Sequence, residues 1–240
     1  MKYALDVHTH TIVSGHAYST LMENAKAASE KGIKVLGTTE HGCMMPNAPH
    51  IWYFNNYKIL PREMYGVTML YGVEANIIDY DGNLDMDDKS LEKLDIVIGS
   101  IHDEVYKIGT TEENTSAFIN VIKSGKVDIL GHLGNPKIPV NFEEIVKCAK
   151  EYNVLIEINN SSFTTSRIGS DSNCTKIAEL CKKYGNTIII NSDAHFCTKI
   201  GEFTEAIKML ESINFPEDKI INSDPYSLIH MLKKRGRKIN

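Results

Sequence analysis

Seven of the nine histidines in this sequence follow short apolar segments that are typical of β-strands. The pattern begins with DVHTH at residues 6–10 and closes with NSDAH at residues 191–195. Imidazoles and carboxylates gathered at one edge of a sheet are the groups that bind metal ions or transfer protons. We therefore take nine side chains as candidate metal ligands: His8, His10, His16, His41, Glu74, His102, His132, Asp193 and His195.

The spacing within two of these segments favours shared ligation. Side chains two residues apart on a strand point to the same face, so His8 and His10 can reach one ion. Asp193 and His195 repeat that spacing on the last predicted strand. A single histidine at a strand end is more often a surface residue, and one HxH pair is weak evidence. The whole set is different, because so many polar groups without partners would be costly to desolvate. It predicts a metal centre.

The number and type of these groups predict how the centre is filled. A zinc ion takes three or four protein ligands, so nine ligands with one bridging carboxylate serve about three ions. An imidazole-rich set favours zinc, with manganese or iron as alternatives, over magnesium or calcium. Three dications, less the charges of Glu74, Asp193 and one hydroxide, leave a formal charge of roughly +3. Such a site favours an anion, and we expect a small phosphate ester.

Strand and helix signals alternate along the whole chain, which indicates α/β architecture. Seven strands are predicted, at residues 3–7, 34–39, 68–73, 95–101, 127–131, 154–158 and 187–191. Helices are predicted after the capping box of Thr20 and Glu23, at 90–94, around 117–122, at 142–152, at 174–184, and after Asp224-Pro225. The near-continuous apolar strands are typical of a covered parallel sheet. Polar residues at each carboxyl end favour a (β/α)7 barrel, formed by one domain of residues 1–240.

Composition narrows the class of protein. The 240 residues are 42% hydrophobic, which is ample for a core. The net charge of −5 does not favour nucleic acid as a partner. The basic run at 233–238 is interpreted as the solvated last turn of a C-terminal helix rather than a nucleic-acid tail.

The five cysteines are odd in number and form no CxxC pair, which argues against disulfides. No signal peptide or membrane helix is predicted, so we expect a cytoplasmic protein. Its oligomeric state stays open.

Contacts to the substrate are predicted from the segments around the strand ends. The candidates are Arg167, Arg62 and Asn160. A guanidinium can form a bidentate pair with phosphate, and a side-chain amide can donate a hydrogen bond to it. A surface ion pair is the alternative for either arginine, and it is favoured for Arg62. Glu157 is expected to orient one of the metal-ligating side chains through a hydrogen bond, without binding the metal itself. Residues 43–65, with the only tryptophan, form either an active-site wall or a packed surface excursion.

At these residues the sequence resembles the polymerase and histidinol phosphatase (PHP) superfamily. Its motifs stand in order as DVHTHT, TTEHG, GVEAN, SIHDE, GHLGNP and NSDAH, and they span the chain with every ligand position present. The further segments GHAYST, APHIWYF, EINNSS and GEF resemble the small stand-alone bacterial PHP phosphatases more than histidinol phosphatase or the polymerase modules.

The resemblance implies a distorted (β/α)7 TIM-like barrel with a trinuclear centre. By analogy, the first ion is held by His8, His10, Glu74 and Asp193. Glu74 then bridges to a second ion held by His102 and His132, and the third is held by His16, His41 and His195. The implied activity is hydrolysis of phosphate monoesters by a hydroxide that bridges two ions. The residues expected to be catalytic are Glu74, Asp193 and His195.

Three other functions remain open. A phosphodiesterase or nuclease would use the same ions, but it needs a groove with basic flanks, which the sequence does not offer apart from its tail. An amidohydrolase also begins with HxH on a barrel strand, and the histidine after the fourth strand, His102, counts against it. A non-catalytic metal-binding protein would not need a ligand set that leaves room for hydroxide.

Overall fold

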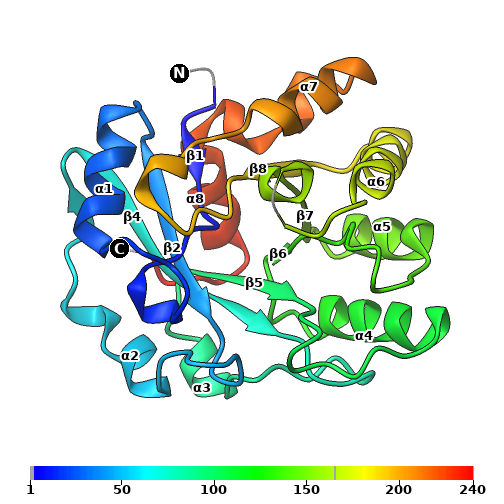
Figure 1. Ribbon diagram of the computed structural model, residues 1–240, viewed down its shortest axis with the longest axis horizontal. Coiled ribbons are helices and arrows are strands. Elements are labelled where there is room, and N and C mark those ends of the chain that lie inside the picture. The colour runs from blue at the N-terminus through cyan, green and yellow to red at the C-terminus, as the bar shows by residue number, and fades with distance from the viewer. Residues whose placement is uncertain (1–2, 165, 240) are drawn as a thin grey trace.

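The computed structural model describes residues 3–164 and 166–239 and contains one sheet with helices around it (Figure 1). Its strands are β1 (Leu5–Asp6), β2 (Val35–His41), β3 (Glu63–Met64), β4 (Val67–Asn76), β5 (Ile96–Ser100), β6 (Ile129–Leu130), β7 (Leu155–Asn159) and β8 (Ile188–Asn191). All of them except β3 pair in parallel in the order β1-β2-β4-β5-β6-β7-β8. The predicted seven-stranded barrel is confirmed. The short β3 pairs antiparallel with β4 and was not predicted.

The first and last strands approach each other and nearly close the barrel. Thr9 and Ala194 form an isolated parallel bridge, and the His10 amide donates to the Ala194 carbonyl at 2.9 Å. The Val7 amide donates to the Asn191 side chain at 3.0 Å. The closure therefore lies just beyond the ends of β1 and β8, where the first and last ligand motifs are found.

The helices are α1 (Leu21–Glu30), α2 (Ile51–Asn55), α3 (Asp88–Leu91), α4 (Thr111–Lys123), α5 (Phe142–Glu151), α6 (Asp171–Tyr184), α7 (Thr204–Ser212) and α8 (Pro225–Lys234). The capping box predicted at Thr20 and Glu23 is present. Gly185 ends α6 with a left-handed backbone at φ 68°. Helix α7 was not predicted. Within the described residues, no helix is both long and apolar enough to cross a membrane.

Helix α8 closes the barrel interior at the amino ends of the strands, and in Figure 1 it lies behind the strands near the middle of the view. Leu228 and Leu232 are fully buried against the inward-facing residues of the strands, such as Leu5, Leu70 and Ile98. A larger core fills the space between the sheet and the outer helices. The interior is therefore packed at the amino ends of the strands, which leaves the carboxyl ends as the place for a site.

The prediction that the C-terminal basic run is solvated is wrong for two of its residues. Lys233 and Lys234 are exposed at the end of α8. Arg235 and Arg237, however, pair with the buried Asp128 at 3.0 and 2.8 Å. Both guanidiniums also donate to backbone carbonyls. They tie the chain end to the amino end of β6 and balance the charge of the Asp128 carboxylate, which among the described residues otherwise accepts only from the Val97 amide at 2.9 Å.

Residues 43–65 mainly form a surface segment that packs on the outside of the barrel, rather than a wall of the site. They contain α2 and β3, and Phe54 and Tyr57 are buried in the outer core. Of this segment only Met45 lines the pocket described below. The excursion thus supports the barrel wall, and a single side chain from it reaches the pocket.

Candidate metal centre

All nine candidate ligands meet at the carboxyl ends of the strands. His41 and Glu74 lie within β2 and β4, whereas the remaining seven lie in the loops that follow β1, β5, β6 and β8. The interpretation that Asp193 and His195 lie on the last strand is wrong, because β8 ends at Asn191. Asp193 has a left-handed backbone at φ 56°, and His132 has φ 25°. Such conformations are uncommon outside glycine and persist where surrounding contacts hold them.

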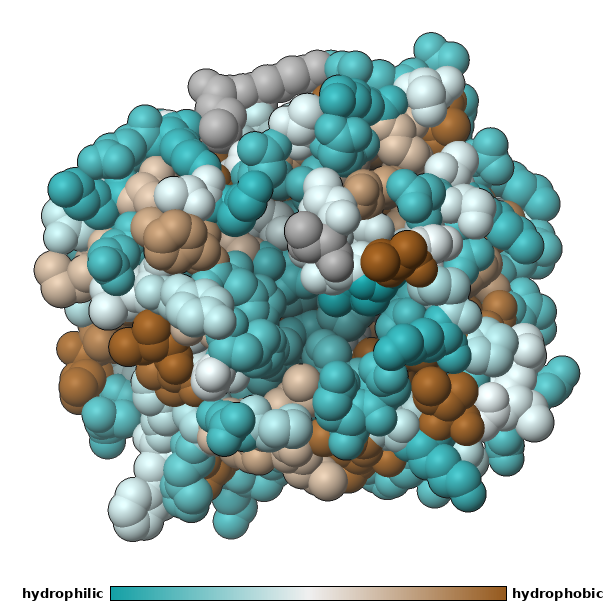
Figure 2. Space-filling model, in the orientation of Figure 1, coloured by the Kyte–Doolittle hydropathy of each residue, from teal (hydrophilic) through white to brown (hydrophobic). Residues whose placement is uncertain are grey.

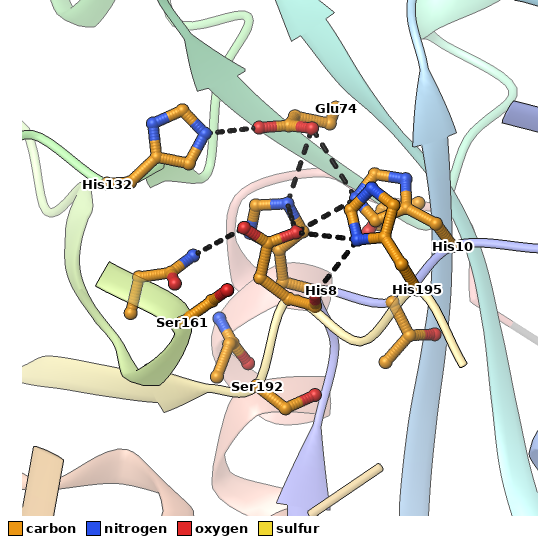
Figure 3. A network of polar contacts seen from close by, with 12 residues as sticks. His8, His10, Glu74, His132, Ser161, Ser192 and His195 are labelled. Carbon is orange, nitrogen blue, oxygen red and sulfur yellow. Dashed lines mark hydrogen bonds and ion pairs between the residues drawn. The ribbon is translucent and has the colours of Figure 1, made fainter. Parts of the chain in front are cut away.

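Glu74 lies at the middle of the cluster, with its two oxygens turned to different partners (Figure 3). Its Oε1 lies 2.7 Å from Nε2 of His132 and 3.4 Å from Nε2 of His102. Its Oε2 lies 3.3 Å from Nε2 of His8 and 3.6 Å from Nε2 of His10. A carboxylate placed in this way can bridge two ions.

Asp193 faces the same two histidines as that second oxygen, and the three residues His8, His10 and Asp193 form a group that could hold one ion. Oδ1 of Asp193 lies 3.6 Å from Nε2 of His8 and 3.3 Å from Nε2 of His10, which repeats the distances that Glu74 makes to the same histidines. Ligand bonds of about 2.0–2.1 Å in tetrahedral geometry put neighbouring ligand atoms roughly 3.3–3.4 Å apart. His8, His10 and Asp193 therefore have the spacing that a zinc-sized ion needs, and Oε2 of Glu74 faces the same two histidine nitrogens.

A third group lies nearer the pocket mouth. Nε2 of His16 is 2.9 Å from Nε2 of His195 and 3.3 Å from Nε2 of His41. His16 is exposed and His195 is half-buried, whereas His8 and His10 are fully buried. Nδ1 of His41 faces Glu74 Oε2 at 2.8 Å, so its imidazole stands between this group and the bridging carboxylate. The cluster thus runs from a buried end to an open one.

The buried atoms of the cluster lack the partners that a polar atom needs. Within the part of the chain that the structure describes, His8 Nε2, His10 Nε2, His41 Nδ1 and Glu74 Oε2 are buried without a hydrogen bond. An unsatisfied buried polar atom costs about 1–3 kcal/mol. These four face one another, and three of them are imidazole nitrogens. Divalent cations at their centre would satisfy all of them at once.

The ring nitrogens that face away from the cluster are bonded to protein. Nδ1 of His8 lies 2.7 Å from Glu157, and Nδ1 of His102 lies 2.7 Å from Asn76. Nδ1 of His10 lies 3.2 Å from Ser14. Bonding of one ring nitrogen to an acceptor leaves the other nitrogen as a lone-pair donor for a metal. The expected orienting role of Glu157 agrees with this geometry.

Two supporting residues escaped the sequence analysis. Asn76 accepts from His102 and donates to Asp85 at 2.6 Å. Its position two residues after Glu74 on one strand was a signal for it, since such side chains share a face. Glu40 is fully buried and accepts from Thr11 and from Ser14, each at 2.6 Å. Nothing in the sequence marked it, because it precedes His41 and points to the other face of β2.

The electrostatics of the cluster favour cations. Burial opposes charge on His8, yet Glu157, Glu74 and Asp193 around it hold the pKa of its imidazole well above the usual value. Burial, helped by the Arg167 guanidinium, lowers the pKa of His132 to about 4. His132 is therefore neutral near pH 7 and can donate a lone pair. Three carboxylates around one imidazole form a surplus of negative charge that metal ions would balance.

Replacement of Glu157 by glutamine is expected to weaken both the fold and metal binding. Its carboxylate accepts from His8 Nδ1 and from the His132 amide at 2.8 Å, and also from two asparagine side chains. Glutamine keeps one acceptor oxygen and turns an NH₂ group toward the other donors, which should cost about 2–4 kcal/mol. Metal affinity should fall roughly 10–100-fold. Urea unfolding of the chelated protein and metal titration measure the two effects. The exposed Glu179→Gln is the control, and equal behaviour of both variants would contradict this role.

Six of the nine candidate ligands line a pocket of about 580 Å³, and the buried His8, His10 and His132 lie against two of these six, Glu74 and Asp193. Figure 2 shows the hollow at the centre of one face, lined mainly by hydrophilic residues. Asn160 and Arg167 both line it. Arg167 donates to Asp193 Oδ2 at 2.8 Å and to Asn159 at 3.1 Å. The side-chain oxygen Oδ1 of Asn160 is already occupied, because it accepts hydrogen bonds from the backbone amides of Glu205 and Ala206 at the start of α7.

Arg62 does not reach this pocket, so its prediction as a substrate contact is corrected. Its guanidinium pairs with Asp95 and lies 5.6 Å from the ring centre of Tyr71. Asp95 directly precedes β5 and thus belongs to the amino end of the sheet. Arg62 lies there because the hairpin of β3 and β4 begins at that end of the barrel.

Comparisons with known proteins agree with this geometry. The model of the PHP domain matches residues 6–221. The chain is 60% identical over 237 residues to a probable phosphatase of Clostridium novyi, covering 99% of this chain and 97% of that protein. It is 54% identical, with the same coverage, to a probable phosphatase of Clostridium botulinum. The histidinol phosphate phosphatase of Lactococcus lactis, solved with zinc, L-histidinol and phosphate, has the same fold at a TM-score of 0.67 and 17% identity, over 89% of this chain and 95% of that one. The chain belongs to the PHP domain family.

Proposed function

We propose that this protein is a metal-dependent phosphatase that hydrolyses small phosphate monoesters. One observation carries the proposal: seven imidazoles and two carboxylates form one cluster, and six of these nine residues line a pocket with an arginine beside them. The names of the Clostridium relatives support phosphatase activity. The zinc and phosphate bound in the Lactococcus structure support both the metal and the substrate class.

We assign the ligands to three ions. His8, His10, Asp193 and Oε2 of Glu74 would hold the first. His102, His132 and Oε1 of Glu74 would hold the second. His16, His41 and His195 would hold the third. The short separations of the ligand atoms within each set support this division. His41 also faces Oε2 of Glu74 at 2.8 Å, so it lies between the third set and the other two. Zinc is the metal we favour, with manganese or iron as alternatives.

Divalent ions, when bound, supply Lewis-acid stabilisation of phosphoryl oxygens and lower the pKa of the attacking water. The chain's own residues do the rest. Arg167 would pair with phosphoryl oxygens, since its guanidinium lines the pocket and is held by Asp193, Asn159 and Ser162. Asp193 would accept a hydrogen bond from the attacking water and orient it, because its carboxylate stays ionised: burial opposes the charge, but His8 and the other positive groups around it hold its pKa well below the usual value. Asn160 would add a hydrogen bond from its amide nitrogen.

Hydrolysis of p-nitrophenyl phosphate and of its bis-ester by the zinc-loaded protein tests this function. We expect the monoester to be strongly preferred, because the single pocket guanidinium and the cationic floor complement a dianion. His102→Ala should lower the turnover rate at least about 100-fold and also lower the metal content, because it removes a ligand of one of the two ions that Glu74 would bridge. Preference for the bis-ester would favour a phosphodiesterase instead. Full activity of His102→Ala would exclude the bridged pair as the reaction centre.

A further inference from the structure

The pocket has two chemically different walls. One wall is polar and comes from the loop after β7, with Ser161, Thr164, Ser166 and Arg167. A second set of lining residues is apolar and comes from three separate loops, namely Tyr18, Met45 and Phe196. We call these three residues the apolar arc. Tyr18 is 77% exposed and Phe196 is 47% exposed, so both rings offer free surface to a ligand.

Backbone contacts hold the apolar arc beside the third ligand group. The Tyr18 amide donates to the His195 carbonyl at 2.8 Å, and the Cys197 amide donates to Ser19 Oγ at 2.8 Å. These two bonds join the loops that carry Tyr18 and Phe196. A turn closed by the Met45 amide and the Gly42 carbonyl presents Met45. That turn lies against Gly15, where a Cβ would come within 2.6 Å of Asn47. The loops that carry these three side chains are therefore fixed by backbone contacts close to His16 and His195 in the chain.

The two rings have no evident structural task. Among the residues that the structure describes, neither Tyr18 nor Phe196 makes an aromatic stacking contact, and neither belongs to the packed cores. Large aromatic side chains that line a pocket yet remain exposed bury their surface when a ligand covers them. Their position at the mouth, next to His16 and His195, puts them where the part of a substrate beyond the phosphoryl group would lie.

We propose that the preferred substrates are phosphate monoesters whose alcohol carries an aromatic ring, which packs on the apolar arc. This inference rests on the phosphatase function proposed above and names the substrate class of the same site. The phosphoryl group would face Arg167 and the metal floor, and the ring would face Tyr18, Met45 and Phe196. Small polyol phosphates would reach the same floor and leave the apolar arc uncovered.

The experiment compares phenyl phosphate with glycerol 2-phosphate on the zinc-loaded protein and on the variants Tyr18→Ala, Phe196→Ala and the double variant. Each single change is expected to raise KM for phenyl phosphate on the order of 10-fold with little change in kcat, because the ring contacts exist before and during the reaction. The values for glycerol 2-phosphate should change less than about twofold. Tyr226→Ala, an exposed tyrosine outside the pocket, is the matched control.

Calorimetric binding of phenylphosphonate and methylphosphonate gives a readout independent of turnover. The wild type should bind the phenyl compound more tightly, and the double variant should lose that preference. Equal losses for both esters, or no loss for phenyl phosphate, would overturn the aromatic substrate class and leave phosphatase function standing. Absence of turnover on both esters by the zinc-loaded wild type would instead overturn the phosphatase function on which the inference rests.

Discussion

Replacement of Glu74 by glutamine is expected to abolish turnover almost completely, with a loss of at least about 1000-fold. Glu74 is the only described residue whose two oxygens face two different sets of histidines, His8 and His10 on one side and His102 and His132 on the other. Glutamine keeps the shape but loses one anionic oxygen and the negative charge. Native mass spectrometry should show that the variant binds fewer ions, with one or two sites lost.

The control for this experiment is Glu63→Gln, which makes the same chemical change on the exposed edge strand β3. It should keep both the metal content and the activity of the wild type. A Glu74→Gln protein that retained three ions and more than about a tenth of the activity would rule out the bridging role assigned to Glu74.

Removal of metal is expected to eliminate activity and to lower the melting temperature by roughly 10 °C. Four buried ligand atoms, on His8, His10, His41 and Glu74, lack hydrogen-bond partners among the described residues. Without cations their desolvation is uncompensated, at about 1–3 kcal/mol for each atom. Bound ions stabilise only the folded state, so their loss appears directly in the stability. Differential scanning calorimetry before and after chelation measures the shift.

Reconstitution completes this test. Zinc, manganese and iron are returned separately, and activity is plotted against ions bound per chain. We expect recovery to require about three ions. Chelator already saturated with zinc serves as the control, because it leaves the protein loaded at the same ionic strength. Unchanged activity and melting temperature in a protein shown to be free of metal would contradict a metal-dependent reaction.

Acid should release the ions, and the direction follows from the ligand chemistry. Imidazoles must be neutral to bind metal, so protons compete with the ions as pH falls. Burial lowers the pKa of His132 to about 4, so this ligand stays neutral until the pH is strongly acidic. The carboxylates Glu74 and Asp193, whose pKa values lie well below normal, stay charged at mildly acidic pH. Metal loss on acidification is therefore expected to begin with the histidines.

The barrel and the edge that carries the site could be predicted because both depend on local sequence. Apolar runs such as those of β5 and β8 form strands that are buried on both faces. The carboxyl ends of parallel strands share one edge, so polar residues that follow the strands must come close together. His102 and His132 follow this rule without any knowledge of their neighbours.

Features that depend on distant contacts could not be predicted. The left-handed backbone at Asp193 and His132, which aims both side chains inward, is held by the packed environment. Arg62 is a predicted substrate contact, but its ion pair with Asp95 places it at the amino end of the sheet. The sequence predicts solvent exposure for Arg235 and Arg237. Both instead donate hydrogen bonds to the buried Asp128, which lies more than a hundred residues earlier in the chain.

The sequence by itself determined the chemical character of this protein, since residue types fix which ions the ligands prefer and the strand pattern fixes the edge where they gather. Tertiary structure alone decided which candidate ligands lie next to one another, that Glu74 stands between two sets of histidines, and that Tyr18 and Phe196 line the same pocket as Arg167. The physical reason is range. Ligand chemistry and strand periodicity are properties of a few adjacent residues, whereas atomic separations of about 3 Å across the barrel arise only when segments far apart in the chain pack together.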